Sequence, residues 1–145
     1  MAIQQISIFI ENKVGALAKV TDLLGKENIN IRALSIAETS DFGILRLIVD
    51  DVDKAAAVMQ KNEQIYALND VLVVAGEDKP GSIGRIISAL SAGEIGMEYA
   101  YAFFAKKDNV AYLMVRVDDN LMTRAKELLE KAGLNVVDDP HMLSF

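Results

Sequence analysis

Two stretches of this chain follow one pattern at a distance of 66 residues. "ENKVGALAKVTDLLGKENINI" runs from Glu11 to Ile31, and "EDKPGSIGRIISALSAGEIGM" runs from Glu77 to Met97. Identities are sparse, but glycine recurs at Gly15 and Gly81, and apolar residues recur at matching places. A repeat of this length in 145 residues predicts two small domains, at residues 1–69 and 70–145.

The first copy is expected to alternate between strands and helices. Ile6, Ile8 and Ile10 recur at every second position, which is typical of a strand. After a turn at 12–15, Val20 and Leu24 recur at helical spacing, and the helix is expected to end near residue 26. The remaining elements, in the order βαββαβ, are strands at 29–38, 44–49 and 64–68 and a helix at 54–62 behind acidic capping residues.

The second copy repeats this order. Ile83, Ile86 and Leu90 mark its first helix, and Gly133 lies where a helix-terminating glycine is expected after the second. Strands are expected at 71–75, 96–105, 110–117 and 134–138, with a turn at 106–109. We therefore predict an α+β fold of two tandem ferredoxin-like βαββαβ units, with antiparallel sheets and helices on one face.

Only Asn69 and Asp70 separate the last strand of the first copy from the first strand of the second. Both residues favour tight turns, and so short a connection predicts that the copies move as one rigid body. The strands at 71–75 and 110–117 are apolar on both faces, although water should cover the face without helices. We expect a homodimer or larger oligomer to cover part of that face.

The composition argues against several classes of function. A net charge of −6 without clustered cations disfavours a nucleic-acid groove or an anionic membrane surface. There are no cysteines, which excludes disulfides, cysteine-ligated zinc and thiol catalysis. Neither a basic signal-peptide segment nor a bilayer-length apolar run is present. We therefore expect a cytoplasmic protein without nucleic-acid or membrane partners.

Residue sets that usually carry catalysis or bind metals are missing. His141 is the only histidine. The acidic clusters at 50–53, 118–119 and 138–139 could suggest a cation site, but acids just before helices usually cap them. Aromatic side chains alternate within 99–103 as on an RNA-binding sheet, but no basic residues interleave with them, which favours sheet packing. We expect no catalytic residue, no metal and no cofactor.

The strand-to-helix turn of each copy is the remaining candidate site. Backbone N–H groups at a helix N-terminus lack intrahelical partners, and the helix dipole adds positive character there. Such an end can receive a carboxylate. Gly15 and Gly81 would let a ligand approach the backbone closely, and Asn12 or Asp78 could contact an ammonium or amide group. The alternative is an ordinary strand-to-helix turn in both places.

These residues resemble the ACT domain, a small-molecule regulatory module of amino-acid metabolism. Asp78-Lys79-Pro80-Gly81 matches the Asn/Asp-x-Pro-Gly-type turn of that family, whereas Asn12-Lys13-Val14-Gly15 keeps the asparagine and glycine but lacks the proline. Asn28-Ile29-Asn30-Ile31 is similar to the start of the family's second strand, which residues 94–97 match less well. The resemblance covers both copies and is closest to stand-alone tandem ACT proteins without an attached enzyme.

The resemblance implies an amino-acid ligand held at an interface between ACT units, by the turn backbone and the start of the second strand. Carried over by position, the implied ligand-binding residues of the first copy are Asn12, Val14, Gly15, Ala16, Leu17, Asn30 and Ile31. Those of the second copy are Asp78, Pro80, Gly81, Ser82, Ile83 and Met97. Gly96 replaces the polar residue found at Asn30, so the first copy is preferred for asparagine-mediated contact.

Our leading hypothesis is a non-catalytic regulatory or sensor protein that binds a small amino-acid ligand between ACT units. The alternative is a regulatory subunit that acts mainly by docking on a catalytic partner of amino-acid metabolism. A third hypothesis, an enzyme on a ferredoxin-like scaffold, lacks a nucleophile or a base. Main-chain contacts recognise the part that all amino acids share, so they leave the side chain of the ligand open.

Overall fold

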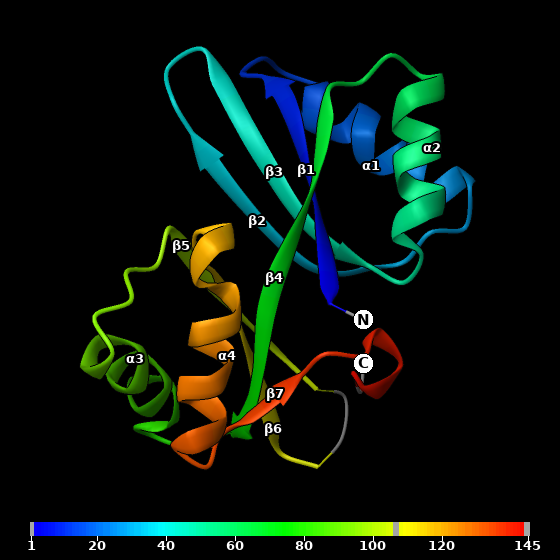
Figure 1. Ribbon diagram of the computed structural model, residues 1–145. Coiled ribbons are helices and arrows are strands. Elements are labelled where there is room, and N and C mark those ends of the chain that lie inside the picture. Colours follow the sequence, from blue (N-terminus) through cyan, green and yellow to red (C-terminus); the bar gives the residue numbers. More distant parts are fainter. Residues whose placement is uncertain (1, 106–107, 144–145) are drawn as a thin grey trace. The chain divides into compact units, whose positions relative to one another are not determined.

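The computed structural model describes residues 2–105 and 108–143. The chain forms two compact units. The N-terminal unit is Gln4–Asn69, and the C-terminal unit begins at Asp70 and includes Ile3 from the start of the chain. Each unit combines helices with an antiparallel sheet (Figure 1).

The N-terminal unit has the predicted order of strands and helices. Its elements are β1 (Ile3–Glu11), α1 (Ala16–Lys26), β2 (Ile31–Glu38), β3 (Phe42–Val49), α2 (Val52–Lys61) and the first part of β4 (Tyr66–Glu77). Its strands lie in the order β2-β3-β1 and pair antiparallel. The N–H of Phe9 donates to the carbonyl of Ile65 at 2.9 Å, which joins β1 to the segment just before β4.

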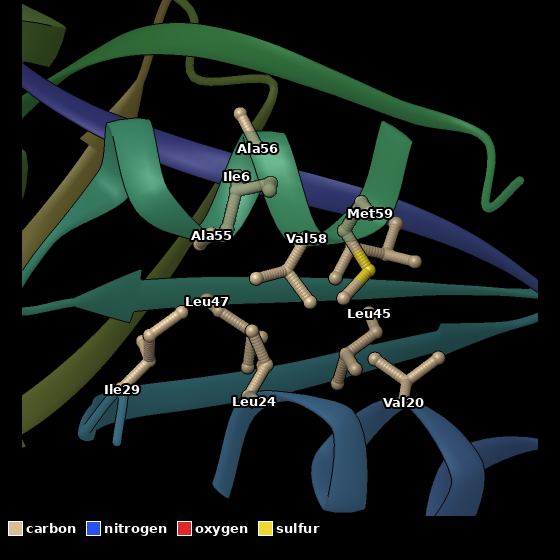
Figure 2. Close-up of a cluster of buried hydrophobic side chains, with 11 residues drawn as sticks. Ile6, Val20, Leu24, Ile29, Leu45, Leu47, Ala55, Ala56, Val58 and Met59 are labelled. Carbon is tan, nitrogen blue, oxygen red and sulfur yellow. The ribbon is translucent and has the colours of Figure 1, made fainter. Parts of the chain in front are cut away.

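The core of the N-terminal unit follows from the periodicity of its elements (Figure 2). Val20 and Leu24, about one helical turn apart on α1, point toward β3, where Leu45 faces them. Alternation along β1 directs Ile6 to the same core, and α2 contributes Met59. These side chains are at most 1% exposed, and removing their apolar surface from water is the main stabilising term of the unit.

The C-terminal unit repeats this architecture. After β4 its elements are α3 (Ser82–Ala92), β5 (Tyr99–Phe104), β6 (Val110–Arg116), η1 (Asp119–Leu121), α4 (Met122–Lys131), β7 (Asn135–Val137) and η2 (Pro140–Met142). Its strands lie in the order β7-β4-β6-β5 and pair antiparallel. Leu90 of α3 and Leu129 of α4 pack on Val74 and Val115 of the sheet. Both units are therefore ferredoxin-like, as the sequence predicts.

The boundary between the units differs from the prediction. Asn69 and Asp70 do not form a turn, because β4 runs through them without interruption. The Ser7 hydroxyl donates to the Asn69 side-chain oxygen at 3.2 Å, and Arg116 Nη1 donates to the Asp70 carbonyl at 2.8 Å. Strand pairing and these partners outweigh the turn propensity of the two residues. The predicted tight turn is therefore wrong.

Smaller differences concern the strands of the C-terminal unit. The strand after α3 begins at Tyr99 rather than at residue 96. Lys106 and Lys107 of the predicted turn lie outside the described residues, whereas Asp108 and Asn109 have φ values of 70° and 51°. Such left-handed backbone suits a turn, and Asn and Asp tolerate it better than most residues.

The C-terminal sheet is apolar on the face opposite its helices. Met114 and Val73 lie on that face and are 0% exposed. The rings of Phe103 and Tyr112 stack there with their centroids 5.1 Å apart. The alternating aromatic residues therefore pack in the sheet, as their pattern favours, and do not offer an open base-stacking surface.

Candidate functional site

Gly15 and Gly81 form the same turn in the two units. Gly15 has φ 91° and ψ −15°, and Gly81 has φ 90° and ψ −13°. Because a side chain strains this conformation, glycine is required immediately before α1 and α3. Neither helix has a side-chain cap at its N-terminus, whereas Asp51 caps α2 by accepting from the Lys54 N–H at 3.0 Å. The first N–H of each helix is used within the turn, because Ala16 donates to the Lys13 carbonyl and Ser82 to the Lys79 carbonyl, both at 3.3 Å. The N–H groups that follow in the first turn of each helix remain available to a ligand.

Main-chain hydrogen bonds hold both turns. In the N-terminal unit, the Lys13 N–H donates to the Glu11 carbonyl at 2.8 Å, and the Asn12 N–H donates to the Asp41 carbonyl at 3.1 Å. The matching bonds of the C-terminal unit run from Lys79 to Glu77 at 2.9 Å and from Asp78 to Asn109 at 2.8 Å. The two turns therefore share these main-chain hydrogen bonds, although Val14 stands where the second copy has Pro80.

A cavity of about 560 Å³ lies beside Gly15 in the N-terminal unit. Its apolar walls are Phe9, Ile10, Val14, Phe42 and Ile65. Gly15 and Ala16 also line it, so the cavity reaches the uncapped end of α1. A cavity of this volume is within the usual range for small-molecule sites.

Charged side chains surround this cavity. Glu11 and Lys13 form an ion pair at 2.9 Å, and the hydrogen bond and charge of Lys13 hold the pKa of the Glu11 carboxyl below its ordinary value. Lys19 and Glu63 line the same cavity, and neither has an ion-pair partner among the residues that the structure describes. The Lys19 ammonium and the Glu63 carboxylate are therefore available to pair with charged groups of a ligand.

Glu63 adopts a backbone conformation that glycine favours. It follows the end of α2 with φ 57°, a position where the missing Cβ of glycine removes a steric penalty. Gly133 takes the matching position after α4 with φ 79°. Asn28 and Glu94 follow α1 and α3 with φ 57° as well. Glu63, whose carboxylate lines the cavity, therefore has a left-handed backbone conformation.

The structure brings part of the predicted first site together. Val14, Gly15 and Ala16 line the cavity, whereas Leu17 packs at the edge of the core. The Asn12 side chain is directed elsewhere, because its Nδ2 donates to the carbonyls of Ser40 at 3.3 Å and of Thr39 at 3.5 Å. Asn12 therefore links the loop between β2 and β3 to the turn before α1. The sequence had suggested contact with a ligand instead.

Asn30 and Ile31 lie at the other end of the unit. Ile31 pairs with Val49, whereas the cavity lies beside the pair formed by Glu11 and Phe42. From residue 42 to residue 49 the strand rises by about 23 Å, at roughly 3.3 Å per residue. A single unit therefore does not bring Asn30 and Ile31 to its own turn.

The predicted residues of the second site are spread in the same way. Asp78, Pro80 and Gly81 are exposed on the turn, Ser82 is half-buried, and Ile83 is 41% exposed. Met97 packs at the edge of the C-terminal core. It lies two residues before Tyr99, which pairs with Arg116, whereas the turn lies beside the pair formed by Glu77 and Val110 at the other end of β6.

Sequence reasoning missed the strand residues that form the cavity walls. Phe9 is the detectable case, because it is a large apolar residue on the strand face opposite Ile8 and Ile10. Phe42 and Ile65 stand next to strand ends, where no periodic pattern predicts a shared cavity.

The acidic clusters serve largely as helix caps. Asp118 accepts from the Asn120 N–H at 2.9 Å, and Asp139 accepts from the His141 N–H at 2.9 Å. In the part of the chain that the structure describes, no group of three or more His, Cys, Asp or Glu side chains is placed to hold a metal. Over the same residues, no helix has the length and apolarity needed to cross a membrane.

Comparison with known sequences gives a family for the whole chain. The sequence pattern of the family described as an ACT domain pair matches residues 1–145. The acetolactate synthase small subunit of Haemophilus influenzae is 31% identical over 91 residues, which are 63% of this chain and 56% of that protein. The isozyme 3 small subunit of Escherichia coli is 33% identical over 70 residues, 48% of this chain and 43% of that protein. The chain thus matches about half the length of these relatives.

Solved structures agree on the fold. A protein from Bacteroides thetaiotaomicron is 39% identical, with a TM-score of 0.88, and the match covers 99% of this chain and 98% of that one. The regulatory subunit of aspartate kinase from Thermus thermophilus is 15% identical, with a TM-score of 0.64, and the match covers 89% and 91% of the two chains. The second likeness concerns the fold alone.

Proposed function

This chain belongs to the family of ACT domain pairs, and from that premise we propose that it is a non-catalytic regulatory or sensor protein for a small amino-acid ligand. The first ACT domain would comprise residues 1–69 and the second residues 70–145. The observation that carries the proposal is the cavity beside Gly15. It combines a helix N-terminus without a side-chain cap, apolar walls, and two charged side chains, Lys19 and Glu63, without an ion-pair partner among the described residues.

The turn at Gly15 would hold the ligand carboxylate. The first N–H groups of α1 have no side-chain cap, and the helix dipole favours negative charge at that end. Gly15 presents no Cβ to a ligand, and space is open where a Cβ would stand. The same description holds for Gly81, which makes the second turn the matching candidate.

A second unit would complete the site. Asn30, Ile31 and Met97 lie at the opposite end of the sheet from the turn of their own unit, so they could reach a ligand only from a neighbouring ACT unit. Exposed apolar side chains on the edge strand β2, Leu34 at 47% and Ile36 at 39%, support association with a further copy. We therefore propose a homo-oligomer with ligands at interfaces between units.

A thermal-shift screen of the twenty amino acids tests the proposal. A ligand present at a hundred times its Kd stabilises a protein by about 2.7 kcal/mol, which corresponds to roughly 5–10 °C in melting temperature at this chain length. We expect such a rise for at least one amino acid. A screen without any rise contradicts the proposal.

Matched glycine variants then locate the ligand. Gly15→Val and Gly81→Val impose the same backbone strain, since the φ values are 91° and 90° and space around both is open. We expect Gly15→Val to abolish binding in titration calorimetry while circular dichroism shows a folded protein, and Gly81→Val to retain the site at Gly15. Equal binding by the parent and by Gly15→Val would place the ligand elsewhere.

The names of the relatives favour a second candidate function. They are small subunits of acetolactate synthase, so this chain could act by docking on a catalytic enzyme of amino-acid metabolism in the cytoplasm. Purification of the full chain from native extract separates the candidates. A sensor elutes alone, whereas a regulatory subunit brings a catalytic chain in fixed proportion.

A further inference from the structure

The two Gly turns have the same backbone but different walls. Glu11 pairs with Phe42 at the N-terminal turn, and Glu77 pairs with Val110 at the C-terminal turn. Two residues before each glutamate, the strands carry Phe9 in the first unit and Ala75 in the second. Aromatic residues at these two strand positions are therefore specific to the N-terminal turn and are not part of the repeated motif.

Large apolar side chains gather around the N-terminal cavity without being buried. Phe9 is 44% exposed, Phe42 59% and Ile65 70%. Single exposed apolar residues are common on protein surfaces, but several around one cavity indicate a binding surface. Their removal from water would favour a ligand that brings its own apolar surface.

The unpaired charges fit the other end of an amino acid. Lys19 lies one turn into α1, and Glu63 follows α2, and both line the cavity. An α-amino acid carries a carboxylate and an ammonium group, so this pair of charges complements its head group. Glu11 and Lys13 are already paired at 2.9 Å and are less available.

We infer that the cavity beside Gly15 selects an α-amino acid with a large apolar side chain, above all an aromatic one, through Phe9, Phe42 and Ile65. This inference rests on the proposed function, since it names the ligand class of the same site. Glu63 receives the ammonium group, Lys19 and the α1 N-terminus receive the carboxylate, and the side chain lies against the rings. Among the described residues of the turn at Gly81, Ala75 and Val110 replace Phe9 and Phe42, so we expect a weaker preference there.

Titration calorimetry of the full chain with L-phenylalanine, L-leucine, L-serine and L-glutamate tests the selectivity. We expect L-phenylalanine and L-leucine to bind and the two polar amino acids to bind at least about a hundredfold more weakly, because each lost methylene in an apolar pocket costs roughly tenfold or more. Phe42→Ala should weaken L-phenylalanine binding by about tenfold or more. Phe104→Ala is the matched control, because Phe104 is 64% exposed in the C-terminal unit and lies outside the cavity.

A second comparison tests the head-group assignment. Glu63→Gln should weaken L-phenylalanine by about tenfold but leave 3-phenylpropionate, which lacks the ammonium group, unchanged. Lys19→Gln should weaken both compounds, since both carry the carboxylate. A Glu63 effect that is equal for the two compounds overturns the assignment of Glu63.

The outcomes separate this inference from the proposed function. Tight binding of a polar amino acid, or binding of L-phenylalanine that Phe42→Ala and Phe104→Ala affect equally, overturns the inference and leaves the proposed function standing. Failure of all twenty amino acids to bind overturns both. Selective binding of apolar amino acids that depends on Phe42 and Glu63 supports both.

Discussion

Replacement of Gly15 by alanine isolates the cost of its backbone conformation. A Cβ at Gly15 meets nothing within 4 Å, so crowding does not contribute to the change in stability. The conformation does contribute, because φ 91° is a region that side chains rarely adopt. A non-glycine residue on left-handed backbone costs about 1–2 kcal/mol, so the free energy of unfolding should fall by about that amount.

Two further glycines provide controls, because their replacement by alanine should change the stability in the opposite direction. Gly25 in α1 and Gly84 in α3 also have open space at the Cβ position, but neither has a positive φ. Alanine in a helix is more favourable than glycine by roughly 0.5–1 kcal/mol. Gly25→Ala and Gly84→Ala should therefore stabilise the protein, although the space at the Cβ position is as open as at Gly15.

Urea denaturation followed by circular dichroism measures all three variants. At this chain length, 1 kcal/mol corresponds to about 2–4 °C, so thermal melts should show Gly15→Ala lower by roughly 2–8 °C and the controls slightly higher. If Gly15→Ala is as stable as the parent, the left-handed turn is not a feature of the protein in solution. Destabilisation by all three variants would point to crowding instead.

Three other predictions concern an ion pair, the boundary between the units and the oligomeric state. In the Lys126→Gln variant, the pKa of Asp138 should rise toward its ordinary range in carbon-13 NMR titrations, because the hydrogen bond from Lys126 at 2.8 Å and the Lys126 charge lower it in the parent. The stabilisation from this pair is present above the unfolded-state pKa of Asp138 and disappears as pH falls through its folded-state pKa. An unchanged pKa in the variant would show that the pair does not persist in solution. Cutting the chain between Asn69 and Asp70 should give two halves without cooperative unfolding, because the cut divides β4 and separates Ile3 from the C-terminal unit; two soluble halves with sharp melting transitions would refute this. Analytical sedimentation of the full chain at micromolar concentration should show a dimer or larger species, and a monomer that persists at much higher concentration would remove the oligomer from the proposal.

Local pattern was sufficient to predict the fold. The alternation of Ile6, Ile8 and Ile10 and the helical spacing of Val20 and Leu24 each indicate which face of an element is buried, and these faces meet in one core. The repeat supplied the rest, since a second copy of the pattern predicts a second copy of the unit. The error at Asn69 and Asp70 arose because turn propensity is a local property, whereas strand continuation depends on partners far along the chain.

The candidate site was predictable only where it depends on backbone. Gly15 and Gly81 carry their conformational requirement in their residue type, so their place at the turn was apparent from the sequence. The cavity walls were not, because Phe9, Phe42 and Ile65 come from three segments whose meeting depends on strand register and on the loop before β4. Asn12 shows the same limit, since its carbonyl partners lie 27 and 28 residues away.

The left-handed backbone of Glu63 has a consequence for directed evolution. Selection of a mutant library for heat resistance alone should enrich glycine at residue 63, as it should at residue 94, because glycine relieves the same strain at both glutamates. The gain at residue 28 should be smaller, because asparagine tolerates left-handed backbone. Glycine at 28 or 94 leaves the cavity intact, whereas glycine at 63 removes the carboxylate that lines it. If Glu63 binds the ammonium group as we infer, thermostable clones with glycine at position 63 should bind the amino acid about tenfold more weakly than clones that keep the glutamate.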